Sequence, residues 1–149
     1  MQKRRAFVTG IAGQDGAYLA RELLSSEYDV YGLVRNQAKT ENLDRLGVQS
    51  QIHLHQGDLS DFALLRDLLS DIRPSHIYNL AAISSLAQAD IDPLHTWTVN
   101  ADAPRAIFDA ALRIEPGVRI VQASSALVFA SNLNATINED SLKAPEGIY

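Results

Sequence analysis

The stretch AFVTGIAGQDG, residues 6–16, decides how this chain folds. The apolar run 6–9 has the character of a buried strand, and it leads directly into three glycines spaced G-x-x-G-x-x-G, at Gly10, Gly13 and Gly16. From Asp15 to Ser25, apolar residues then recur at helical spacing. Glycines between a strand and a helix let the backbone approach a phosphate closely, and the first N–H groups of the helix can bind it. The stretch therefore predicts a strand–turn–helix unit that binds a pyrophosphate, with a purely structural turn as the alternative.

Strand-like and helix-like segments alternate along the rest of the chain. Further strands are predicted at 30–34, 52–55, 76–80 and 118–122, and helices at 61–72 and 99–113. Pro104 is unfavourable inside the last helix, and the tail 132–148 is predicted to be a long loop. Such alternation predicts an α/β fold, a doubly wound parallel sheet with helices on both faces. Ligands of these sheets bind beyond the carboxyl ends of the strands.

The composition limits the kind of protein that this chain can be. Its 149 residues, 46% of them hydrophobic, are enough for one soluble domain. There is no cysteine, and no apolar run reaches the roughly 18 residues that a membrane span needs. The net charge of −5, with acids and bases interspersed, argues against a nucleic-acid surface. We expect a cytoplasmic protein that binds neither nucleic acid nor a membrane.

The end of the predicted strand 30–34 bears on the choice of cofactor. In dinucleotide-binding folds, an Asp or Glu about 20 residues past the glycines holds the ribose hydroxyls of NAD. Here the strand is followed by Arg35, whose planar guanidinium can pair with the 2′-phosphate of NADP. Arg35 therefore favours NADP over NAD, and the alternative is a solvated surface arginine.

Two other strand ends carry candidate site residues. After the strand at 76–80, small side chains would let the backbone pass close beside a cofactor, and the candidates are Leu80, Ala81, Ala82 and Ser84. Simple tight packing is the alternative there. His53 and His55 lie on one face of the strand at 52–55, but no further ligand is evident. We predict no metal site.

Ser125 and Tyr149 are the candidate catalytic residues. A tyrosine phenol titrates near 10, so a tyrosine that acts as an acid or base near neutrality needs a lowered pKa. A nearby lysine ammonium and a positive nicotinamide ring can supply that shift. The serine hydroxyl would orient the oxygen of the substrate.

These residues resemble the extended short-chain dehydrogenases that modify nucleotide sugars, and among them the GDP-mannose 4,6-dehydratase family. The resemblance is carried by VTGIAGQDGAYL at 8–19, LHQGDLSD at 54–61 and YNLAA at 78–82. Its most specific part is Gln14, Asp15 and Gly16. It implies a Rossmann-type fold, in which residues 1–149 form the NAD(P)-binding domain and the C-terminal substrate-binding part is absent from this chain.

The resemblance also implies roles for Asp58 and Leu59, which follow the third strand. Their position in the family contacts the adenine, with the carboxylate accepting a hydrogen bond from the exocyclic amine. An ordinary helix N-cap near Ser60 or Asp61 is the alternative, and both can hold. The implied substrate is a nucleotide sugar, with a GDP-sugar favoured, and the full-length protein is expected to be a homo-oligomer.

The implied reaction begins with hydride transfer from C4 of the sugar to NADP, with Tyr149 as base, and continues with elimination of water across C5 and C6. The family's lysine would follow four positions after Tyr149, so residues 1–149 alone are expected to be inactive. The family's carboxylate two residues after the Ser/Thr is Leu127 here, and a leucine cannot take a proton. This departure leaves open a 4-keto-6-deoxyhexose reductase, a sugar 4-epimerase or, in another class, a non-catalytic NADP-binding module.

Overall fold

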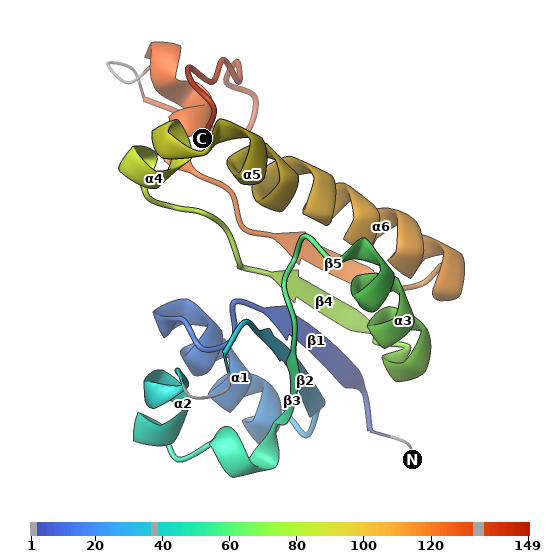
Figure 1. The fold of residues 1–149 in the computed structure, drawn as a ribbon. Coiled ribbons are helices and arrows are strands. Elements are labelled where there is room, and N and C mark those ends of the chain that lie inside the picture. The colour runs from blue at the N-terminus through green and yellow to red at the C-terminus, as the bar shows by residue number, and fades with distance from the viewer. Residues whose placement is uncertain (1–2, 37–38, 133–135) are drawn as a thin grey trace.

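The computed structural model describes residues 3–36, 39–132 and 136–149. Within them, five parallel strands form one sheet in the order β3-β2-β1-β4-β5 (Figure 1). The strands are β1 (Arg5–Thr9), β2 (Asp29–Val34), β3 (His53–Gln56), β4 (His76–Asn79) and β5 (Arg119–Gln122). All five predicted strands and the α/β fold are confirmed. The chain runs outward from β1 to β3 on one side and then returns to place β4 on the other, so the strand order reverses between β1 and β4.

Helices cover both faces of the sheet (Figure 1). They are α1 (Gln14–Ser25), α2 (Glu41–Arg45), α3 (Phe62–Ile72), α4 (Leu86–Ile91), α5 (Pro93–Trp97) and α6 (Ala103–Ile114). Helical segments of other types are η1 (Gln49–Gln51), the π-helical η2 (Thr98–Asp102) and η3 (Ala126–Asn132). The predictions of α1 and α3 are confirmed. The helices α2, α4 and α5 were not predicted, because five or six residues are too few to show a helical period.

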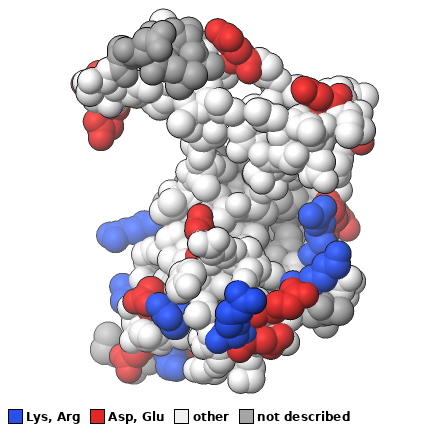
Figure 2. Space-filling model, turned by 90° about the vertical axis from the view of Figure 1, so that its left-hand side faces the viewer, with Lys and Arg blue, Asp and Glu red and all other residues white. Residues whose placement is uncertain are grey.

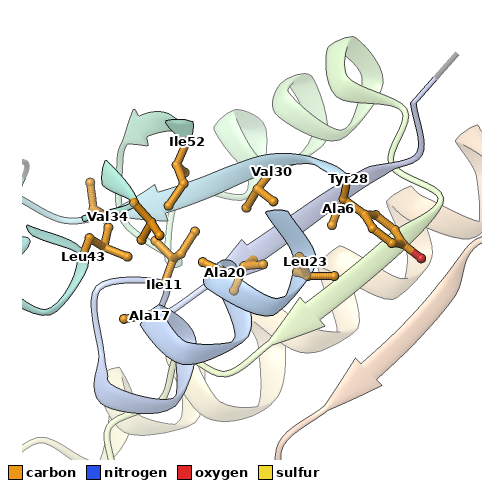
Figure 3. Close-up of a cluster of buried hydrophobic side chains, with 12 residues drawn as sticks. Ala6, Ile11, Ala17, Ala20, Leu23, Tyr28, Val30, Val34, Leu43 and Ile52 are labelled. Atoms are coloured by element: carbon orange, nitrogen blue, oxygen red, sulfur yellow. The ribbon is translucent and has the colours of Figure 1, made fainter. Parts of the chain in front are cut away.

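Two buried clusters, one on each face of the sheet, hold the helices in place. Ala6 of β1 packs with residues of α1 and α2 (Figure 3). Val8 belongs to the same cluster. Phe7, between them in the sequence, points to the opposite face and packs among residues of α3 and α6. Strand side chains alternate between faces, and helices cover both, so the central strands bury side chains on both faces, including the polar Thr9 and Asn79. Because the helices cover the two faces, the edge at the carboxyl ends of the strands is bordered by the loops that follow them.

The prediction of a helix at 99–113 is wrong about where the helix begins. The helix α6 begins at Ala103, so Pro104 lies in its first turn rather than in its interior. The preceding residues form the π-helical turn η2, which continues from α5. Proline lacks the N–H that an α-helix interior requires, and its ring crowds the carbonyl of the preceding turn. A wider π turn ahead of Pro104 relieves both problems.

The predicted tail loop is confirmed only in part. The described residues 136–149 contain no helix or strand, residues 133–135 lie outside the described part of the chain, and Asn132 ends η3. The tail is tied back to η3, because Ala144 N donates to Val128 O at 2.8 Å. Over the described residues, no helix has the length and apolar character to cross a membrane.

Candidate functional site

A cleft of about 650 Å³ opens beyond the carboxyl ends of the strands. It lies between the residues that follow β1 and those that follow β4, where the strand order reverses and ligands of open parallel sheets bind. Figure 2 looks onto this side of the molecule and shows a hollow between the lower body and the overhanging upper part. On the face shown, Lys and Arg side chains lie on the lower body, where Asp and Glu side chains lie among them, and the upper part shows only Asp and Glu.

The glycine turn forms one wall of the cleft. Gly10 has a φ of +68°, which favours glycine, and a Cβ there would lie 2.9 Å from Ala81 N. A Cβ on Gly16 would collide with the carbonyl oxygen of Gly10. Gly13 is the N-cap of α1 and makes no side-chain cap bond. The first turn of α1 therefore offers N–H groups to an anion beside the cleft.

Two basic side chains give the far end of the cleft a positive charge. Arg35 directly follows β2, Lys39 lies four residues further on, and both line the cleft. Among the described residues, the ion pairs join other side chains and include neither of the two. Their charges are therefore available to an anionic ligand.

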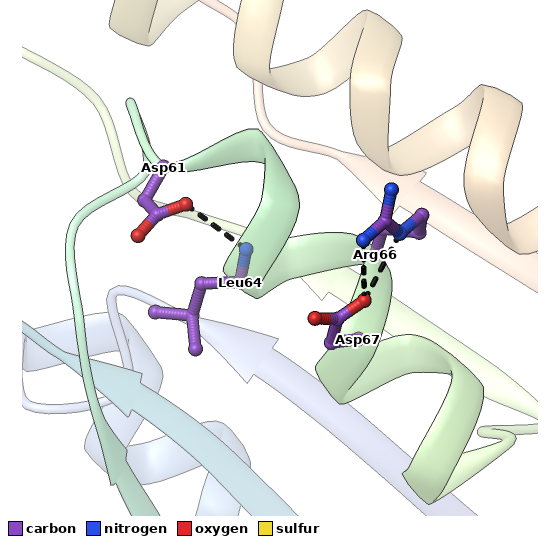
Figure 4. Close-up of polar contacts among 4 residues, drawn as sticks. All are labelled: Asp61, Leu64, Arg66 and Asp67. Atoms are coloured by element: carbon purple, nitrogen blue, oxygen red, sulfur yellow. Dashed lines mark hydrogen bonds and ion pairs between the residues drawn. The ribbon is translucent and has the colours of Figure 1, made fainter.

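Asp58 lines the cleft just after β3, the strand that pairs with β2, and is held by Ser60. Its Oδ1 accepts hydrogen bonds from Ser60 N at 2.9 Å and from Ser60 Oγ at 2.7 Å. The N-cap of α3 is instead Asp61, which accepts from Leu64 N at 3.0 Å (Figure 4). The N-cap role is thus confirmed for Asp61, and Asp58 lines the cleft.

The pKa of Asp58 is lowered from its ordinary value of 3.8. The bond from the Ser60 N–H is the largest cause, partial burial opposes it, and the Ser60 hydroxyl and the charge of Arg35 add to the lowering. A carboxyl whose pKa is lower when folded stabilises the protein above its unfolded pKa. That contribution is lost as the pH falls through the folded value.

We expect Ser60→Ala to raise the pKa of Asp58 toward 3.8, because one of the two bonds to the charged form is removed. A carbon-13 NMR titration of the Asp58 carboxyl between about pH 2 and 6 measures it. Ser70→Ala in α3 is the control, and it should leave the Asp58 titration unchanged. Identical Asp58 titrations in Ser60→Ala and the parent protein would show that the Ser60 hydroxyl does not contribute to this shift in pKa.

The segment after β4 forms the opposite wall and is held by hydrogen bonds to β1 and to η2. Ala81 N donates to Thr9 Oγ1 at 3.2 Å. Further along, Asn100 of η2 binds both backbone groups of Ile83, accepting from Ile83 N at 2.8 Å and donating to Ile83 O at 3.0 Å. Sequence reasoning missed Asn100, because its role depends on the π turn, which no sequence period revealed.

Eight of the residues predicted from sequence come together in the cleft. They are Gly10, Gly13, Arg35, Asp58, Leu59, Leu80, Ala81 and Ala82. Lys39 and Val99 also line it and were not predicted. Gln14, Asp15 and Gly16 begin α1 and Ser84 precedes α4, and none of these four is among the lining residues. In the described part of the chain, no group of three or more His, Asp or Glu side chains is placed to hold a metal ion.

Ser125 and Tyr149 do not line the cleft. Both are half-buried, and Ser125 lies just beyond β5, three residues after its last residue. Ser125 Oγ accepts a hydrogen bond from Leu127 N at 3.2 Å. A hydroxyl that accepts from the backbone still has its proton to donate, so Ser125 can bind the oxygen of a substrate.

The chain matches the sequence model of the family described as GDP-mannose 4,6 dehydratase over residues 7–149. It is 35% identical over 148 residues to a GDP-mannose 4,6-dehydratase from Sordaria araneosa, an alignment that covers 98% of this chain and 27% of that protein. The chain spans about a third of the length of the curated relatives that it matches, from 27% to 39%.

Solved structures share the same arrangement of strands and helices. A UDP-N-acetylglucosamine 4-epimerase from Methanobrevibacter ruminantium is 25% identical with a TM-score of 0.83, and the match covers all of this chain and 46% of that one. The Bordetella bronchiseptica enzyme WbmH, solved in complex with NAD⁺, is 26% identical with a TM-score of 0.72 over 86% of this chain and 41% of that one.

Proposed function

The chain belongs to the GDP-mannose 4,6-dehydratase family, and from that premise we propose that its cleft binds a nicotinamide dinucleotide, NADP rather than NAD, in an enzyme that modifies a nucleotide sugar. The observation that carries the proposal is the meeting of three parts in one cleft. These are the glycine turn, the basic residue after β2 and the segment after β4. The first suits a pyrophosphate, the second a ribose phosphate and the third a flat ring laid along the backbone.

Each part of the cleft has a proposed partner on the cofactor. Gly10, Gly13 and the first turn of α1 hold the pyrophosphate, with Gln14, Asp15 and Gly16 shaping that turn. Arg35 binds the 2′-phosphate, and Asp58 accepts a hydrogen bond from the adenine amine. Leu80, Ala81, Ala82 and Ser84 border the nicotinamide. When bound, the cofactor supplies a hydride acceptor and donor.

Tyr149 and Ser125 are proposed to act on the sugar. The Tyr149 phenolate takes the proton of the C4 hydroxyl, and the Ser125 hydroxyl donates to the C4 oxygen and orients it. Residues 1–149 form the cofactor-binding domain in this proposal, and a GDP-sugar is the favoured substrate. The enzyme is proposed to be a cytoplasmic homo-oligomer, as the resemblance to the family suggests.

Leu127 favours a second candidate function. It occupies the position of the family's elimination carboxylate, and it is half-buried just beyond Ser125. An enzyme without that base can still exchange hydride at C4, as a reductase or a 4-epimerase would. The family model and the relatives that the chain matches are named GDP-mannose 4,6-dehydratases, which supports the dehydratase reaction over this alternative.

We expect Leu127→Glu to raise the rate of water elimination by about 100-fold, the lower range of what a placed base contributes. Leu127→Gln is the matched control, since glutamine has the shape of glutamate without its basicity. The rate is measured on the full-length protein as 4-keto-6-deoxy product formed per minute. Equal rates in the two variants would exclude position 127 as the site of the base.

The proposed function is tested by incubating the full-length protein with GDP-mannose and NADP. The mass of the sugar nucleotide is then measured by mass spectrometry. Loss of one water identifies a dehydratase. NADP binding without loss of water favours a reductase, an epimerase or a non-catalytic NADP-binding module over a dehydratase. Absence of NADP binding contradicts the proposal.

A further inference from the structure

A row of three polar side chains crosses the carboxyl ends of three neighbouring strands. Thr9 of β1 pairs in register with Asn79 of β4, which pairs with Gln122 of β5. The Thr9 hydroxyl donates to Asn79 Oδ1, and Asn79 Nδ2 donates to Gln122 Oε1 at 2.7 Å. Thr9 and Asn79 are completely buried. A break in this row would leave a buried polar group without its partner, which is unfavourable.

Each end of the row holds the backbone of a different part of the candidate site. At one end, Ala81 N donates to Thr9 Oγ1 at 3.2 Å, and Ala81 lines the cleft. At the other end, Gln122 Nε2 donates to Ala123 O at 2.7 Å, two residues before Ser125. Linked hydrogen bonds reinforce one another and fix the groups they join. The row therefore connects the wall of the cleft to the segment that carries the candidate serine.

We propose that Gln122 is a positioning residue that couples occupation of the cleft to the placement of the Ser125 segment. The inference rests on the proposed function, because it needs a dinucleotide in the cleft. Gln122 is the member of the row to alter, since its side chain is exposed whereas Asn79 is buried in the sheet. Glutamate at position 122 still accepts from Asn79 Nδ2, but it cannot donate to Ala123 O and repels that carbonyl oxygen.

Hydrogen exchange measured by mass spectrometry, with and without saturating NADP, tests this coupling without requiring turnover. In the parent protein, we expect NADP to slow exchange in residues 79–83 and also in residues 123–128. In Gln122→Glu, the slowing at 79–83 should persist, while the slowing at 123–128 should fall by about threefold or more. Arg119→Ala, an exposed change at the other end of β5, is the control and should behave as the parent protein.

Three results would overturn the inference, and they are distinguishable from one another. Full slowing at 123–128 in Gln122→Glu would mean that the cofactor reaches this segment without Gln122. Faster exchange throughout β1 and β4 in Gln122→Glu without NADP would mean that Gln122 only stabilises the sheet. If NADP slows exchange nowhere in the parent protein, the proposed function itself fails, and this inference fails with it.

Discussion

Replacing Gly10 by alanine is expected to lower the free energy of unfolding by about 3 kcal/mol or more and to abolish dinucleotide binding. The two causes are separate. Gly10 has a φ of +68°, which costs a residue with a Cβ about 1–2 kcal/mol. The added Cβ would also lie 2.9 Å from Ala81 N and 3.0 Å from Leu80 C, so the glycine turn must move away from the opposite wall. That movement deforms the place where the pyrophosphate is proposed to bind.

Gly47 provides the matched control for this substitution. Its φ of +67° is almost the same as that of Gly10, but nothing lies within 4 Å of the position that a Cβ would take. Gly47→Ala should therefore show the backbone cost alone, about 1–2 kcal/mol, with unchanged affinity for NADP. Urea unfolding and NADP titration of both variants measure the difference. Equal losses of stability in the two would show that contact with residues 80–81 is not what requires glycine at position 10.

Replacing Arg35 by glutamine is expected to weaken NADP binding by about 10- to 100-fold and to leave NAD binding unchanged. A hydrogen bond to a charged group contributes about 1.5–3 kcal/mol, and the 2′-phosphate is the only part in which the two cofactors differ. Arg35 lines the cleft directly after β2, in the place where an acidic residue would instead hold the ribose of NAD. Titration of each cofactor into the variant gives both affinities.

Arg45→Gln is the control for the loss of one arginine charge in the same region, because Arg45 lies in α2 and does not line the cleft. It should leave both affinities unchanged. Equal weakening of NAD and NADP by Arg35→Gln would place Arg35 on a group that the cofactors share. If Arg35→Gln weakens the binding of neither cofactor, Arg35 is a solvated surface arginine.

The fold was predictable because each strand carries its own signal. Short segments that contain apolar residues marked the five strands, and the glycines at residues 10–16 fixed the direction in which the chain leaves β1. Parallel strands place their carboxyl ends at one edge. The residues after β1, β2, β3 and β4 therefore had to meet, and the cleft lining confirms that they do.

The hydrogen bonds of Asn79 and Asn100 could not be predicted from the sequence, because they depend on strand register and on irregular helix geometry. Asn79 lies in a stretch that sequence reasoning singled out, but its bonds to Thr9 and Gln122 require the strand pairing that only the folded sheet defines. Asn100 reaches Ile83 because η2 is a π turn rather than an α-helix. Ser125 and Tyr149 are candidates because of their residue types and their order along the chain. Ser125 lies between β5 and the 3₁₀ turn η3, and Tyr149 lies in a tail without helix or strand, so no period in the sequence could place them relative to the cleft.

The central claim is that the cleft binds a nicotinamide dinucleotide, and NADP titration into nitrogen-15-labelled protein tests it most directly. We predict saturable shifts in the amide signals of Gly10, Gly13, Asp58 and Ala81, with Arg66 and Ser70 of α3 unchanged. Absence of shifts in a protein whose spectrum shows it to be folded, or shifts confined to α3 and α6, would contradict the claim.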